Sequence, residues 1–104
     1  MGEEVPYRTA VSEDDRVLAL RSEGRSFGRI AKTVGLADGR AALDAFHRSL
    51  RRQAPDRQAA LRRAELARLA KLSVHLDHCA SFDPAELNRQ RRVVERLRDL
   101  LLAE

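Results

Sequence analysis

Cysteine, aromatic residues and long apolar runs are all scarce in this chain of 104 residues. The single cysteine, Cys79, excludes an internal disulfide framework and is typical of proteins from a reducing compartment. No apolar run approaches the ~20 residues that a membrane-spanning helix needs, and residues 1–11 lack the apolar core of a signal peptide. We therefore expect a cytoplasmic protein with no membrane contact.

Arrangements that would support catalysis are also missing from the sequence. No nucleophile has an obvious partner base, no glycine-rich phosphate loop follows a strand, and no carboxylate pair is spaced for acid–base work. His75 and Cys79 have the i, i+4 spacing of two ligands on one helical face, but a metal site normally needs three or four ligands. We predict a protein that is not an enzyme and has no cofactor and no metal.

Aromatic residues make up 4% of the chain, whereas Arg, Ala, Leu and Glu dominate and apolar residues rarely alternate. This composition favours helices over strands. The length fits one domain. We predict an all-α fold.

Residues 26–50 carry the most specific pattern in the chain. Ala31 is a small residue where two helices would cross, and Gly35 suits a turn with a left-handed backbone. Ser26 and Asp38 can cap the two helices on either side of this turn. Apolar residues recur at helical spacing before and after it: Phe27, Ile30, Val34, Leu36, Leu43, Phe46 and Leu50. The pattern predicts a helix-turn-helix.

On these residues, in EGRSFGRIAKTVGL and DGRAALDAFHRSL, the chain resembles the homeodomain-like helix-turn-helix of bacterial and phage DNA-binding proteins. Resolvase-type and small-terminase-type domains belong to this group. The resemblance covers residues 12–52, and residues 37–40 lengthen the approach to the third helix. It implies a three-helix DNA-binding domain over residues 12–53 with no catalytic role.

The charge distribution points to the same kind of partner. Residues 1–23 carry 3 basic and 6 acidic side chains, whereas residues 47–73 carry 8 basic and 2 acidic ones. A basic block of this kind attracts polyanions through counterion release, and nucleic acid is the commonest polyanion in the cytoplasm. A solvated arginine-rich helix is the alternative interpretation.

One face of the third helix is expected to enter a DNA groove. If its apolar residues point inward, Arg40 and Arg48 are available to guanine, and Asp44 to a cytosine amino group. Arg51 and Arg52 come late enough in the helix to meet phosphate. The full set of residues expected to contact DNA is Arg29, Lys32, Arg40, Ala41, Asp44, His47, Arg48, Arg51 and Arg52.

The start of the chain is expected to be a flexible arm over residues 1–11. The first helix is predicted to begin after Ser12, which forms a capping box with Asp15, and to end at Gly24. Acidic residues in its first turn suit the positive end of the helix dipole.

The second half of the chain, residues 56–104, is predicted to be a long antiparallel helical hairpin. Pro55 separates it from the third helix, and a second helix begins at Asp83 and Pro84 with Glu86 closing a capping box. Its wide apolar stripes favour a homodimer that forms a four-helix bundle over a hairpin folded onto its own helix-turn-helix. The residues expected at the dimer contact are Leu69, Leu72, Leu76, Val94, Leu97 and Leu101.

The leading functional interpretation is a sequence-specific double-stranded DNA-binding protein, a small dimeric transcriptional regulator associated with the nucleoid. A phage-type DNA-packaging or recombination accessory, assembled as a ring, uses the same chemistry. An alternative of another class is a helical protein-interaction module that binds a partner such as the transcription machinery. A nucleoid protein that binds DNA without sequence preference stays open as well.

Overall fold

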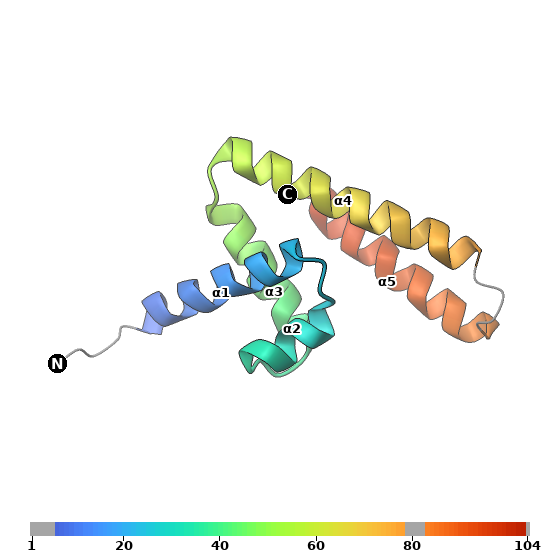
Figure 1. Cartoon of the computed structure of the whole chain (residues 1–104), viewed down its shortest axis with the longest axis horizontal. Helices are drawn as coiled ribbons and strands as arrows, with labels where there is room; N and C mark the ends of the chain where they lie inside the picture. Colours follow the sequence, from blue (N-terminus) through green and yellow to red (C-terminus); the bar gives the residue numbers. More distant parts are fainter. Residues whose placement is uncertain (1–5, 79–82, 104) are drawn as a thin grey trace. The chain divides into compact units, whose positions relative to one another are not determined.

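A computed structural model describes residues 6–78 and 83–103, with the backbone alone at residues 6–10. These residues form helices and connecting turns without a strand, which confirms the all-α prediction. The chain divides into two compact units at Gln58 and Ala59 (Figure 1). None of the described helices is long and apolar enough to cross a membrane. The helices are α1 (Pro6–Ser22), α2 (Phe27–Val34), α3 (Gly39–Arg52), α4 (Pro55–Asp77) and α5 (Pro84–Leu102).

The first unit is built by α1, α2 and α3, which cross around one small apolar core (Figure 1). Phe27 and Phe46 meet edge to face with ring centroids 5.7 Å apart, which joins α2 to α3. All three apolar positions of α3 that were expected to point inward are buried. The core side chains are Val17, Leu18, Ile30, Ala31, Ala42, Leu43, Ala45, Phe46 and Leu50.

The turn between α2 and α3 has the predicted local chemistry. The Ser26 hydroxyl accepts a hydrogen bond from the Arg29 N–H at 3.3 Å, and an Asp38 carboxylate oxygen accepts one from the Ala41 N–H at 2.9 Å. Gly35 has φ +88°, the left-handed conformation that ends α2. Both predicted caps and the glycine turn are therefore confirmed.

The predicted start of the first helix is wrong. Helix α1 begins at Pro6, so Ser12 lies inside the helix and does not cap it. Proline is favoured in the first turn because the amide hydrogen it lacks would have no helical partner there, and no helix breaker stands between Pro6 and Ser12. Residues 6–11 of the expected arm are therefore helical, and residues 1–5 lie outside the described part.

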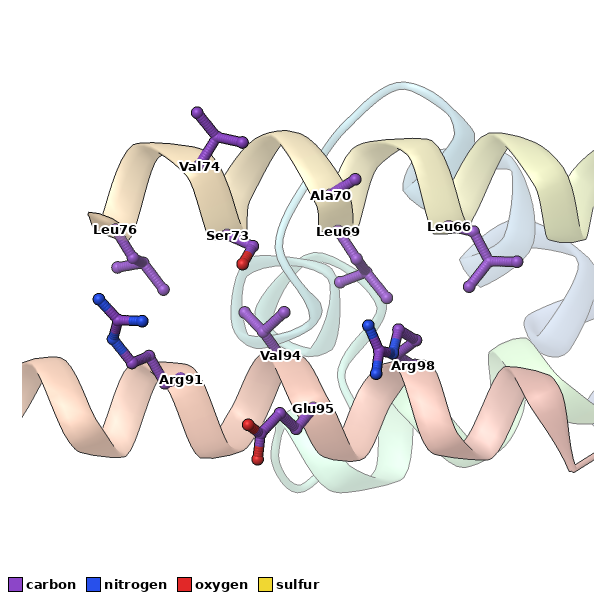
Figure 2. Close-up of a pocket in the computed structure, with 10 residues that line it drawn as sticks. All are labelled: Leu66, Leu69, Ala70, Ser73, Val74, Leu76, Arg91, Val94, Glu95 and Arg98. Atoms are coloured by element: carbon purple, nitrogen blue, oxygen red, sulfur yellow. The ribbon is translucent and has the colours of Figure 1, made fainter. Parts of the chain in front are cut away.

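The second unit contains most of α4 and all of α5, which run antiparallel. Leu69, Leu76 and Val94 point toward one another between the two helices (Figure 2), and all three are buried. Asp77 and Arg91 join the helices through an ion pair of 2.8 Å.

Two details of the hairpin differ from the prediction or lie beyond the described residues. Asp83 makes no side-chain cap, and Glu86 instead accepts hydrogen bonds from Arg89 and Gln90 farther along α5. The predicted capping box is therefore wrong, because Glu86 has partners one turn later. Cys79, which has the i, i+4 spacing of a second ligand with His75, lies outside the described residues.

Candidate nucleic-acid interface

One side of α3 forms an exposed strip, and the rest of the helix packs on the core. Ala42, Ala45 and Ser49 are buried, and they limit this strip on one side. His47 is also buried, at 7% exposure, with its ring edge to face against Phe46. The helix turns this side chain toward the core, so little of it is accessible, and the DNA contact of His47 stays a prediction. The α3 residues left on the strip are Arg40, Ala41, Asp44, Arg48, Arg51 and Arg52.

A buried carboxylate joined to two arginines lies beside this strip. Asp14 of α1 has a side chain only 4% exposed, and it accepts two hydrogen bonds from Arg48, at 2.9 Å from Nε and 3.0 Å from Nη2. Arg52 donates a third, from Nη2 at 3.1 Å. Arg48 and Arg52, which were expected to contact DNA, also fasten α3 to α1.

Burial and these arginines act in opposite directions on the pKa of Asp14. Burial raises that pKa, but the hydrogen bonds and charges of Arg48 and Arg52 outweigh it, so the pKa lies below its ordinary value of 3.8. The same hydrogen bond raises the pKa of Arg48. Both groups therefore stay charged at neutral pH.

This depressed pKa predicts an acid-dependent loss of stability. An unfolded Asp14 binds its proton at a higher pH than the folded one, so its contribution to the free energy of unfolding is complete above about pH 5 and is lost as pH falls through the folded pKa. We expect the difference in free energy of unfolding between the wild type and Asp14→Asn to shrink as the pH falls from about 5 through the folded pKa. Urea unfolding across this range measures it, and a constant difference would contradict the prediction.

A chain of hydrogen bonds continues from this ion pair along α3. The Ser49 hydroxyl donates to Asp15 at 2.6 Å, and the Gln53 amide donates to the Ser49 carbonyl at 3.1 Å. Arg57, in the first turn of α4, donates from Nε to the Gln53 side-chain oxygen at 3.0 Å. Gln58 donates to the carbonyls of Arg51 and Gln53, both at 3.4 Å. The carboxyl end of α3 is thus held by side chains rather than by a glycine cap.

Helix α2 adds a cationic hollow along one side, from the turn before it to its last turn. The lining residues of this surface depression are Glu23, Gly24, Arg25, Ser26, Arg29, Lys32 and Thr33. Arg25 is partly balanced by Glu23 at 3.6 Å, whereas Arg29 and Lys32 are exposed. A surface with more cations than carboxylates attracts an anion.

The first half of α3 carries one basic and one acidic side chain, unlike the cationic hollow beside α2. Arg40 and Asp44 face each other one turn apart, with Nε and a carboxylate oxygen 3.9 Å from one another, and both side chains are more than half exposed. At this exposure the pair is weak, so either group is available to another partner. Ala41 is half-buried beside them.

The six residues expected at the dimer contact fall into two groups. Those buried within the single chain are Leu69, Leu76, Val94 and Leu101. Leu72 is 39% exposed and Leu97 is half-buried, so these two are the ones accessible to a partner. The first four are already covered within the single chain, and their contact with a second chain stays a prediction.

Sequence reasoning did not identify the role of Asp14. It was counted among the acidic residues of the first helical turn, whereas it lies in the middle of a helix and forms a buried ion pair. A signal was present in the spacing of Arg48 and Arg52, which places two cations on one face of α3 at i, i+4.

Within the described ranges, no group of three or more His, Cys, Asp or Glu side chains is placed to hold a metal ion. No protein-family model, curated protein or solved structure matches the chain.

Proposed function

We propose that the first unit binds double-stranded DNA, with α3 in the major groove and α2 beside the backbone. One observation carries the proposal: the segment from α2 to α3 combines a glycine turn with a surface rich in cations. Residues 27–52 contain six basic and two acidic side chains, and none of the six basic ones is buried. Such a surface attracts the phosphates of DNA.

Roles within the interface follow from position along the helices. Arg29 and Lys32 lie at the cationic hollow and would bind phosphate oxygens. Arg40 and Asp44 are near the start of α3, which is the part of a recognition helix that reaches base edges. Ala41 is small enough to let the helix approach a thymine methyl group. This assignment makes the protein a sequence-specific reader.

We also propose that the hairpin joins two copies of the chain, which would make the protein a dimeric transcriptional regulator. On α5, Val93, Leu97 and Leu100 recur at i, i+4, i+7 and form an apolar flank. The opposite flank has the same spacing but consists of Arg91, Glu95 and Arg98, which line a groove of about 320 Å³ with α4 (Figure 2).

A second copy is the occupant that fits this apolar flank best. Two helices cannot enclose a core, and here Val93 is 52% and Leu72 39% exposed. Helices α4 and α5 have 23 and 19 residues, so two hairpins of this length can align along their whole extent as a four-helix bundle. A twofold dimer would place two α3 helices on half-sites about one turn of DNA apart.

The test of DNA binding is the double variant Arg29→Ala/Lys32→Ala, measured by fluorescence anisotropy on a labelled duplex over a range of salt. We expect affinity to fall about 10-fold to 100-fold near 0.15 M salt, and the slope of log K against log salt to become shallower by about 2, because two phosphate contacts are lost. Arg63→Ala/Lys71→Ala on α4 removes the same charge from exposed positions and should change both quantities little. Equal losses in the two variants would contradict the assignment of α2.

Selection from a randomised duplex library at physiological salt separates the candidate functions. Enrichment of a palindrome supports a dimeric sequence reader, and a tandem repeat supports a ring-forming packaging or recombination accessory. Retention without enrichment indicates a backbone binder. A wild-type protein that is not retained at all would overturn the proposal and favour the protein-interaction module.

A further inference from the structure

We propose that Asp14 positions Arg48 for a phosphate of the DNA backbone. The proposal rests on the DNA-binding function above and adds a residue of α1, outside the helix-turn-helix, to the binding surface. It starts from the shape of the ion pair: the Asp14 side chain is 4% exposed, whereas that of Arg48 is 48% exposed. One end of the contact is therefore buried and the other faces solvent.

The hydrogen-bond donors of Arg48 divide in the same way. A guanidinium has five N–H donors, and Asp14 takes the Nε–H and one hydrogen of Nη2. The edge formed by Nη1 and Nη2 carries two further N–H groups, one on each nitrogen. This edge is directed away from the carboxylate of Asp14. Two parallel N–H groups of this kind match two oxygens of a phosphate.

Holding the guanidinium in place favours binding. A free arginine side chain has many rotamers to lose on binding, and a bidentate partner at its base removes much of that freedom before DNA arrives. Arg52 gives Asp14 a single hydrogen bond and also lies 3.8 Å from Asp15. Arg48 is held through one whole edge by two hydrogen bonds, and its side chain is more exposed than that of Arg52, 48% against 31%. The free edge of Arg48 is therefore the one in this cluster that is open to an anion.

Position along α3 indicates phosphate rather than a base. Arg48 is the tenth of the 14 residues of α3. Base contacts come from the first part of a recognition helix, and residues later in the helix meet the backbone. The earlier expectation that Arg48 reads guanine is replaced by this assignment.

The experiment compares Asp14→Asn with Glu13→Gln in salt-dependent DNA binding. Glu13 is the exposed neighbour of Asp14 on α1. Both variants make the protein more positive by one charge, and charge alone would tighten binding to DNA. We expect Glu13→Gln to bind as tightly as the wild type or more tightly. For Asp14→Asn we expect binding about 5-fold to 10-fold weaker, with a salt slope shallower by about 1, because Arg48 no longer holds its phosphate contact. An Asp14→Asn protein that binds as tightly as Glu13→Gln would overturn the proposal.

A second variant covers the case in which Asp14→Asn does not fold at the assay temperature, as judged by circular dichroism. Arg48→Lys keeps the charge and an ion pair with Asp14 but has no fork. We expect it to bind about 5-fold more weakly than the wild type, and equal binding would overturn the proposal. If the wild type itself does not bind DNA, the proposed function fails as well. If only Arg29→Ala/Lys32→Ala weakens binding, the DNA-binding function stands and the role of Asp14 fails alone.

Discussion

Leu50→Ala is expected to lower the free energy of unfolding of the first unit by about 2 to 5 kcal/mol. Leu50 is fully buried near the carboxyl end of α3, among the side chains that join this helix to α1 and α2. Alanine removes three carbon atoms and leaves a cavity that the three short helices can fill only partly. Since small domains have total stabilities of only 5 to 15 kcal/mol, the change would unfold a large fraction of molecules on mild heating.

Thermal unfolding followed by circular dichroism measures this effect. For a unit of this size, each 1 kcal/mol corresponds to about 4 to 8 °C, so the midpoint should fall by about 10 °C or more. Leu36→Ala is the matched control: the same atoms are removed from a half-buried position after the α2 turn, and we expect a loss of roughly 1 kcal/mol. Equal losses at Leu36 and Leu50 would show that the core is not centred on the crossing of the three helices.

The parts of the fold that the sequence predicted are those decided by neighbours along the chain. Ser26 and Asp38 cap helices through amides three residues away, and Gly35 takes its left-handed conformation within one turn. Ala31 and Phe46 are buried as their spacing predicts. Caps and helical period involve three or four residues, so they can be read without knowing the tertiary structure.

The parts that were missed depend on contacts between distant residues. Asp14 and Arg48 are 34 positions apart, and no local pattern distinguishes this carboxylate from the exposed Glu13 beside it. His47 was placed on the flank of the DNA-binding face, although a rotation of α3 by a few tens of degrees decides between exposure and burial. A prediction of the DNA-contacting residues therefore needed the crossing of α1 over α3.

In the hairpin, too, the sequence pattern did not decide which apolar side chains are buried. Wide apolar stripes predicted that both helices bury one side, and Leu69 and Val94 do so within the single chain. The stripes alone did not indicate which residues are covered by the neighbouring helix and which remain accessible. That division assigns the proposed contact to Val93, Leu97 and Leu100, of which only Leu97 was among the residues expected to mediate dimerisation.

Val93→Glu is expected to convert the proposed dimer into a monomer. In a single chain Val93 is 52% exposed, and a glutamate there costs less than about 0.5 kcal/mol. At the centre of an interface between two hairpins the same carboxylate loses its water and meets its own copy, so the dissociation constant should rise about 100-fold or more. Sedimentation equilibrium at tens of micromolar measures the change, from about twice 11.7 kDa for the wild type to 11.7 kDa for the variant.

Asn88→Glu provides the control for this experiment. It adds the same charge to the same helix at an exposed position off the apolar flank, and the dimer should survive it. If Val93→Glu remains dimeric while folded, the contact lies elsewhere on the hairpin.

A wild type that is monomeric at these concentrations would remove the dimer altogether. The expectation of a palindromic site would then fail as well, because one α3 helix can read only one half-site. DNA binding through a single copy would then depend mainly on phosphate contacts, which gives Arg29, Lys32 and Arg48 a larger share of the affinity.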